Sequence, residues 1–258
     1  MSDFSNKVVI VTGASSGIGA ACALKFAAAA AKLVLVGRNV ENLSGVAAQC
    51  EQTSGMKPLE VVADISVDED VERIVSEAVR HHGRIDVLVN NAGIYLNAGI
   101  LDGIATFDKI MATNLRGTYQ LTSRVVPHLI ESKGNIVNIS SMLSTKPKGI
   151  LVPYCMSKAA LDMFTQATAL ELGPKGVRVN AVNPGPINTE LFKRGGLEAA
   201  ANDKLFEYFE QVSPLQRVAG AGDVAEVVCF LASARAACVT GCLHVVDCGL
   251  SLGHIGSF

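Results

Sequence analysis

The chain has 258 residues, 49% of them hydrophobic, and a formal net charge of -2 at pH 7. This length suits one packed α/β unit, so we expect residues 1–258 to form a single dinucleotide-binding and catalytic domain. Basic and acidic residues are interspersed, which gives no reason to expect nucleic acid or a membrane as partner and favours a small-molecule ligand. The seven cysteines form no CxxC pair and leave one unpaired in any disulfide scheme, and residues 1–4 lack the basic-then-apolar pattern of a signal peptide. Both observations predict a cytoplasmic protein.

Short runs rich in Val, Ile and Leu alternate with segments of helical period, a pattern typical of strands joined by crossover helices into a parallel sheet. The strand candidates are 7–11, 33–36, 59–63, 87–89, 135–139, 177–182 and 242–246. The helix candidates are 18–31, 40–53, 68–82, 107–129, 154–172 and 223–233. The strands are too apolar for a sheet with one wet face. The sequence therefore predicts a doubly wound (Rossmann) α/β fold with a seven-stranded parallel sheet and helices on both faces. Residues 185–222, rich in Gly and Ala, are expected to form a substrate-binding lid.

A glycine-rich turn, TGASSGIG at residues 12–19, follows the first strand directly and opens a helix. The amides and dipole of a helix N-terminus suit a phosphate group, and glycine lets the backbone approach it closely. The spacing is GxxxGxG, which differs from the GxGxxG of the dinucleotide fingerprint. The same residues also fit GxSxG, which would make Ser15 the nucleophile of a serine esterase. Only 14 residues precede Ser15, however, and they leave no room for the upstream strand whose loop completes that site.

The second strand ends in Val36-Gly37-Arg38-Asn39, where dinucleotide folds distinguish NAD from NADP. No carboxylate stands here to repel a 2′-phosphate, and the guanidinium of Arg38 can pair with one. NADP(H) is therefore favoured over NAD(H), although Arg38 can also be a solvated turn residue and Glu41 can still reach a ribose. Asp64, at the end of the third strand, can accept from the adenine amino group or cap the next helix.

Tyr154 and Lys158 lie four residues apart on a predicted helix and share one face, so the ammonium can lower the pKa of the phenol. Such a tyrosine can donate a proton to a carbonyl oxygen or accept one from an alcohol. Ser141, thirteen residues upstream and just past the fifth strand, can hydrogen-bond the same oxygen. Because ligands bind at the carboxyl ends of parallel strands, these residues, the glycine turn and Asn90-Asn91-Ala92-Gly93 are expected to converge.

Five ordered motifs now stand in the sequence: TGxxxGxG at 12–19, NNAG at 90–93, NxxG at 114–117, YxxxK at 154–158 and PGxxxT at 184–189. The chain from residue 7 to about 247 resembles the short-chain dehydrogenase/reductase (SDR) family, in particular its NADP(H)-preferring carbonyl and ketoacyl reductases. The resemblance implies an oxidoreductase of CH-OH and C=O groups. The basic residue that many NADP(H)-preferring members carry in the glycine turn is absent at Ser16, so NAD(H) stays open.

The resemblance also implies roles for individual residues. Tyr154 would be the acid/base, Lys158 would lower its pKa and hold the nicotinamide ribose, Ser141 would orient the carbonyl, and Asn114 would anchor a water that relays protons to Lys158. The cofactor would contact Gly13, Ser15, Ser16, Gly17, Ile18, Gly19, Arg38, Asn39, Asp64, Ile65, Asn91, Ala92, Gly93, Tyr154, Lys158, Pro184, Gly185, Ile187 and Thr189. Singly, Ser141 and Asn114 can instead be helix caps and Lys158 a solvated lysine. The five histidines show no metal-ligand spacing, so no metal is expected.

An apolar carbonyl compound, such as a ketoacyl, steroid or xenobiotic compound, is the expected substrate. Specificity is expected to come from residues 94–101, residues 142–153 and the lid. The side chains that can form the pocket, or pack the lid onto the core, are Leu143, Leu151, Leu191, Phe192, Leu197, Phe206 and Phe209. The alternatives are an NAD-dependent alcohol dehydrogenase of the same family and a non-catalytic NADP-binding redox sensor. The resemblance implies a homo-oligomer, usually a tetramer, for which the apolar segment 238–252 can provide an interface.

Overall fold

The computed structural model describes residues 4–188 and 199–253. Within these ranges seven parallel strands form one sheet in the order β3-β2-β1-β4-β5-β6-β7. The strands are β1 (Val8–Thr12), β2 (Lys32–Gly37), β3 (Leu59–Val62), β4 (Val87–Asn90), β5 (Asn135–Ile139), β6 (Arg178–Pro184) and β7 (Leu243–Val246). Because β1 pairs with both β2 and β4, the strand order reverses between β1 and β4. The connections after these two strands diverge at that point and open a crevice at the carboxyl edge of the sheet.

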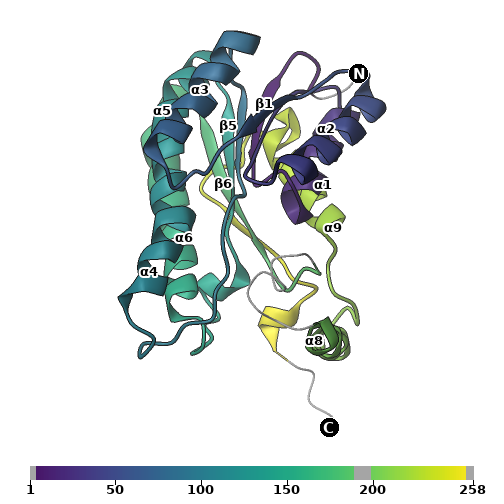
Figure 1. Ribbon diagram of the computed structural model, residues 1–258, viewed down its shortest axis with the longest axis vertical. Helices are drawn as coiled ribbons and strands as arrows, with labels where there is room; N and C mark the ends of the chain where they lie inside the picture. Colours follow the sequence, from purple (N-terminus) through teal and green to yellow (C-terminus); the bar gives the residue numbers. More distant parts are fainter. Residues whose placement is uncertain (1–3, 189–198, 254–258) are drawn as a thin grey trace.

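Helices cover both faces of the sheet, which confirms the predicted fold (Figure 1). One face carries α1 (Gly17–Ala28), α2 (Val40–Ser54) and α9 (Ala221–Ala232). The other carries α3 (Asp68–His82), α4 (Ile104–Met111), α5 (Thr118–Ser132) and α6 (Val152–Leu172). Successive side chains of a strand point to opposite faces, so Val9 and Val11 of β1 join the core beneath α1 and α9, while Val8 and Ile10 join the core beneath α3 and α5.

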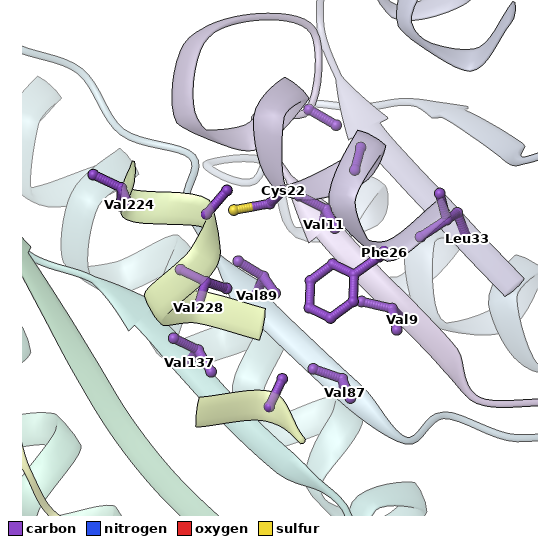
Figure 2. Close-up of a cluster of buried hydrophobic side chains, with 14 of the residues drawn as sticks. Val9, Val11, Cys22, Phe26, Leu33, Val87, Val89, Val137, Val224 and Val228 are labelled. Carbon is purple, nitrogen blue, oxygen red and sulfur yellow. The ribbon is translucent and has the colours of Figure 1, made fainter. Parts of the chain in front are cut away.

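Figure 2 shows how α1 is fixed on the sheet. Cys22 and Phe26 of α1 lie beside Val224 and Val228 of α9, and all four side chains are buried over the central strands. Small residues elsewhere in α1 let these two helices approach closely, and a close-packed interior resists displacement. The N-terminus of α1, which follows the glycine-rich turn, therefore has a fixed position above the crevice. None of the helices in the two described ranges is both long and apolar enough to cross a bilayer.

The predicted helix 107–129 is wrong as one continuous α-helix. The structure has α4, then a π-helical segment η1 (Ala112–Gly117), then α5. A π turn admits an extra residue without interrupting the apolar stripe, so the sequence pattern cannot distinguish it from an α turn. Glycine is required at the end of this segment, because a Cβ at Gly117 would lie 2.3 Å from the carbonyl oxygen of Ile65.

Other helix boundaries differ from the predictions by a few residues. The helix predicted over 18–31 ends at Ala28, since Ala30 has a left-handed φ of 59°. The segment 185–222, expected to be a lid, contains a helix, α8 (Ala199–Val212), which lies beyond the carboxyl ends of the strands (Figure 1). Residues 189–198 of this segment lie outside the described ranges. Short 3-10 turns complete the fold: η2 (Met142–Ser144), η3 (Gly173–Lys175), η4 (Ala234–Ala236) and η5 (Leu250–Leu252).

Candidate active site

A cavity of about 810 Å³ lies at the carboxyl edge of the sheet. The predicted site residues that line it are Gly13, Ser15, Ser16, Gly17, Ile18, Arg38, Asn39, Asp64, Ile65, Asn91, Ala92, Gly93, Ser141, Tyr154, Lys158, Pro184, Gly185 and Ile187. Gly19 and Asn114 lie directly behind the wall and contact lining residues. Thr189 is outside the described residues. A volume of this size, continuous from the glycine-rich turn to Tyr154, has the dimensions of a ligand site.

The glycine-rich turn has a shape that favours glycine at several points, including Gly17, whose φ of 56° is left-handed. Gly13 has a left-handed φ of 65°, and a Cβ at Gly19 would lie 2.3 Å from the carbonyl oxygen of Gly13. The first turn of α1 carries no acidic side chain. The backbone amides at this N-terminus have no hydrogen-bond partners within the helix. Together with the helix dipole, they give this end of the cavity a positive potential that suits a phosphate group.

The NNAG motif holds this turn in place. The Asn91 side-chain amide donates to the carbonyl oxygens of Thr12 and Gly13 at 2.9 and 3.2 Å. The Thr12 hydroxyl accepts from the backbone amides of Asn91 and Ala92, both at 3.0 Å. The loops after β1 and β4 are thus bonded to each other. Asn91 lines the cavity, but its amide group is engaged with the turn, so its side chain positions the backbone there.

Arg38 and Asp64, predicted to contact different parts of the cofactor, form an ion pair with each other. The Arg38 guanidinium donates to the Asp64 carboxylate at 3.0 Å, while 60% of the Arg38 side chain stays exposed. Burial alone would raise the pKa of Asp64, but hydrogen bonds from Ser66 and Arg38 outweigh it and lower that pKa. Asp64 does not cap α3, whose N-cap is Val67. A 2′-phosphate at Arg38 would share the guanidinium with this carboxylate.

Tyr154 lies on the first turns of α6, 7% exposed, with its hydroxyl hydrogen-bonded to Ser141. Burial raises the pKa of Tyr154 well above its usual value; the Ser141 hydrogen bond opposes this, and Tyr95 and Cys155 reinforce it. This direction is opposite to the lowering expected from Lys158. Burial dominates because the Lys158 ammonium is 5.8 Å from the centre of the ring and donates to the carbonyl oxygen of Ile139 at 2.8 Å. Tyr154 is therefore held protonated at neutral pH.

Lys158 is buried, not solvated, and lies one helical turn beyond Tyr154. Burial lowers its pKa to about 8, and the carboxylate of Asp162, a further turn along α6, acts in the opposite direction. A lysine in a cavity wall whose pKa is about 8 can carry a positive charge or release a proton under ordinary conditions.

Asn114 does not cap a helix; it lies inside the π segment η1. Its side chain accepts from the backbone amide of Ile94 at 2.8 Å and donates to the Ile94 carbonyl oxygen at 3.0 Å and to the Ser157 hydroxyl at 3.2 Å. Ser157 donates in turn to the carbonyl oxygen of Tyr154 at 2.7 Å. The π turn thus directs Asn114 toward the backbone of α6 beside Tyr154 and toward the loop after β4.

The far end of the cavity is built by side chains that belong to none of the motifs. Tyr95 packs edge-on against Tyr154, with 5.2 Å between the ring centres. The other lining residues at this end are Met142, Leu143, Lys148, Ile150, Leu151, Leu205, Tyr208, Phe209 and Leu250. Of the predicted pocket residues, Leu143, Leu151 and Phe209 line the cavity. Phe206 is buried against Phe209 without lining the cavity, and Leu191, Phe192 and Leu197 are outside the described side chains. Tyr95 lies within residues 94–101, a segment expected to shape specificity, although the residue itself was not singled out.

The esterase alternative finds no support in the cavity. Ser15 lines it close to Gly37, and the described lining residues include no histidine that could act as its base. A group of three acidic, histidine or cysteine side chains suited to a metal ion is likewise absent from the described part of the chain.

Comparison with known proteins gives consistent matches over almost the whole length. Residues 13–251 match a family model described as enoyl-(acyl carrier protein) reductase. The chain is 35% identical to an L-fucose dehydrogenase from Bos taurus over 97% of this chain and 92% of that protein. It is 34% identical to a glucose 1-dehydrogenase from Gluconobacter oxydans, over 96% and 93%.

Solved structures agree with these matches. A short-chain dehydrogenase/reductase from Caenorhabditis elegans, solved with cofactor, has a TM-score of 0.94 at 33% identity and covers 98% of both chains. A 3-ketoacyl-(acyl-carrier-protein) reductase from Brucella melitensis in complex with NADH has a TM-score of 0.87 at 33% identity, over 96% of this chain and 99% of that one. L-Sorbose reductase from Gluconobacter frateurii with NADPH and L-sorbose has a TM-score of 0.89 at 32% identity, over 97% and 99%. The chain belongs to the short-chain dehydrogenase/reductase family, whose members are oxidoreductases of alcohol and carbonyl substrates.

Proposed function

We propose that this protein is an NADP(H)-dependent oxidoreductase that reduces a ketone or aldehyde, or oxidises the matching secondary alcohol. The observation that carries the proposal is the position of Tyr154. Its hydroxyl, bonded to Ser141, lies in the wall of a cavity that runs from a phosphate-binding turn at one end to a pocket of side chains at the other. When bound, a nicotinamide cofactor supplies or accepts the hydride.

The protein groups supply the proton. A tyrosine that burial keeps protonated is a proton donor, which suits the reduction of a carbonyl oxygen placed beside it. The Ser141 hydroxyl donates a second hydrogen bond to the same carbonyl oxygen of the substrate. Lys158 holds positive charge nearby and binds the ribose, and Asn114 anchors the water through which protons reach Lys158. In the reverse direction Tyr154 must first lose its proton, and a positive Lys158 favours that loss.

NADP(H) is proposed over NAD(H) because Arg38 stands at the end of β2 with most of its side chain exposed, and no acidic residue occupies the preceding position Gly37. Asp64 opposes this preference by occupying part of the guanidinium. An NAD-dependent alcohol dehydrogenase is the alternative, which the NADH complex of the related ketoacyl reductase supports.

For the substrate we propose a carbonyl compound with an apolar body. Leu143, Leu151, Leu205 and Phe209 supply apolar surface at the far end. Lys148 is the cation among the described residues of that end, so an acidic group on the substrate would meet it there. Several relatives are sugar dehydrogenases or reductases by name, which makes polyhydroxy carbonyl compounds the second class to test.

The same proposal extends to the whole molecule. We propose that the chain acts as one domain, with residues 185–222, including α8, covering the substrate. The seven free cysteines support a reducing, cytoplasmic location. Val245 and Leu252 in the segment 238–252 are 51% and 87% exposed, which supports a homo-oligomer, taken as a tetramer by family resemblance.

Oxidation of NADPH in the presence of a panel of carbonyl compounds tests the catalytic proposal. The panel should include cyclic diketones, ketoacyl thioesters and ketoses. We expect turnover by the wild type and a fall of about 10²- to 10⁴-fold in kcat/KM for Tyr154→Phe, because the proton donor is lost. Tyr119→Phe is the matched control, since Tyr119 is 60% exposed on α5. Equal rates for Tyr154→Phe and wild type would contradict the mechanism, and NADPH binding without turnover of any compound would favour a redox sensor.

Paired titrations with NADPH and NADH test the cofactor proposal. We expect the wild type to bind NADPH more tightly and Arg38→Asp to weaken NADPH binding about ten- to hundredfold, since a charge-assisted hydrogen bond is replaced by repulsion. NADH binding should change little. Unchanged NADPH affinity in Arg38→Asp would remove Arg38 as the determinant.

A further inference from the structure

The mechanism above makes no use of Asp162, a buried carboxylate on the same helix as Tyr154 and Lys158. Asp162 belongs to α6, four residues beyond Lys158, which is itself four residues beyond Tyr154. Side chains at this spacing lie on one face of a helix. Tyr154 is 7% exposed, Lys158 5% and Asp162 6%. Their phenol, ammonium and carboxylate groups therefore form a buried row along α6 that begins at the cavity wall.

Asp162 is held by an asparagine that also holds the catalytic serine. The Asn183 side-chain amide lies 2.8 and 3.1 Å from the two Asp162 carboxylate oxygens. The same amide group lies 3.2 Å from the carbonyl oxygen of Ser141 and 3.1 Å from the hydroxyl of Ser144. Asn183 is 3% exposed. The carboxylate is therefore held by a neutral donor, the Asn183 amide, and no arginine or lysine forms a salt bridge with it among the described residues.

A buried ammonium is costly unless a negative charge lies nearby. Asp162 raises the pKa of Lys158 against the larger, lowering effect of burial. Other titratable groups beside the row are Tyr95 and Cys155, which are uncharged when protonated. The charged side chains of the elements packed against α6 lie elsewhere: Asp108, Lys109, Arg116 and Lys175 are exposed, and Arg178 donates to the carbonyl oxygens of Leu231 and Ser233 at the opposite edge of the sheet.

We propose that Asp162 is a positioning residue that keeps Lys158 positively charged and, through Asn183, fixes Ser141 relative to it. A single buried carboxylate then serves both polar neighbours of Tyr154. The effect on activity rests on the proposed function of Lys158, whereas the effect on the stability of the cofactor-free protein does not.

Thermal unfolding of the cofactor-free protein at two pH values tests the charge. Asp162→Asn preserves the shape and the acceptor for Asn183 but removes the charge, so the pKa of Lys158 in the folded variant falls below about 8. At a pH where Lys158 is charged in both proteins, only the wild type has the attraction between the Lys158 ammonium and the Asp162 carboxylate. As pH rises through the wild-type pKa of Lys158, this attraction is lost. We expect the variant to unfold roughly 4 °C below wild type at pH 6.5 and by less than half that difference at pH 9.5. Glu171→Gln, at an exposed acid of the same helix, should show neither effect.

A second readout uses activity. For Asp162→Asn, the alkaline decline of kcat/KM should begin roughly one pH unit lower than in wild type, and Asp162→Glu should restore most of the difference. A Tm deficit that is equal at both pH values, with an unshifted pH profile, would show that Asp162 serves only as a structural acceptor and would overturn the proposal. If the protein proves inactive on every compound, the stability arm still decides the question.

A double variant covers the case in which Asp162→Asn does not fold alone. Lys158→Met removes the buried ammonium that the carboxylate offsets, so the Lys158→Met/Asp162→Asn protein should fold and unfold at a higher temperature than Asp162→Asn. A double variant no more stable than Asp162→Asn would contradict the role in charge compensation.

Discussion

The two ends of the cavity are built by different means. At the end where the cofactor is proposed to bind, the wall is largely backbone: a glycine turn, the N-terminus of α1, and an asparagine that bonds one loop to the other. At the far end the wall is side chains, from Tyr95, the loop before α6, and α8. A backbone wall requires particular residues at particular positions, whereas a side-chain wall can change its chemistry one residue at a time. We therefore expect the first end to select the cofactor and the second end to select the substrate.

The largest effect should come from adding a single methyl group to the backbone wall. In Gly19→Ala the new Cβ would lie 2.3 Å from the Gly13 carbonyl oxygen, so the turn must shift. Overpacking costs about 1–3 kcal/mol. We expect NADPH binding to weaken by roughly ten- to hundredfold, measured by fluorescence titration.

Gly45→Ala is the matched control, because Gly45 lies within α2 and a Cβ there has no neighbour within 4 Å. It should leave binding unchanged and stabilise the protein by about 0.5–1 kcal/mol. If both variants bound NADPH equally well, the claim that the backbone wall requires particular residues at particular positions would be contradicted.

An intermediate effect is expected in the side-chain wall. Lys148→Glu should raise KM about five- to tenfold for a carbonyl substrate that bears a carboxylate, because an attraction becomes a repulsion. The methyl ester of the same compound should show little change, and so should the cofactor Kd.

Lys146→Glu makes the same charge change two residues away, at an exposed position that does not line the cavity. Steady-state kinetics on the acid and ester pair would distinguish the two lysines. Similar KM values of both variants for the acid would mean that substrate binding depends on the net charge of the loop and not on the position of Lys148.

The smallest effect concerns the ion pair between Arg38, just after the end of β2, and Asp64, just after the end of β3. Asp64→Asn keeps the hydrogen bonds to Ser66 but releases Arg38 from a carboxylate. Exposed ion pairs contribute up to about 1 kcal/mol, so NADPH affinity should rise about threefold while NADH affinity stays constant. A fall in NADPH affinity would instead indicate that Asp64 contacts the cofactor more strongly than it restrains Arg38.

The same division explains what the sequence could predict. The order of strands and helices, and the residues of the backbone wall, follow from motifs whose spacing the geometry dictates: Gly13 and Gly19 are required by clashes, and Asn91 by its bonds to the turn. The π segment was missed because its apolar pattern resembles that of an α-helix. Lys148 and Tyr208 lie in segments expected to shape the substrate pocket, but the sequence could not single them out, because no backbone constraint requires a lysine or a tyrosine at those positions.

The pKa of Tyr154 shows a different limit. The spacing of Tyr154 and Lys158 predicts a lowered pKa, yet burial has the opposite and larger effect. Burial depends on residues far away in the chain, such as Tyr95 and Ile110 in the cluster around Tyr154, so local spacing alone could not give its magnitude. The Asp162 to Asn183 contact also joins residues that are not neighbours in the chain.

The π segment also has a consequence for chain length. A π turn holds one residue more than an α turn, so deleting one residue within 112–117 would allow a regular α-helix there. Ile110 and Leu121, both fully buried, could still face the interior, but Asn114 would lose its position beside Ile94 and Ser157. We therefore expect a single deletion in this segment to lower activity more than stability. Here it is the count of residues, as much as their identity, that places Asn114 beside the active site.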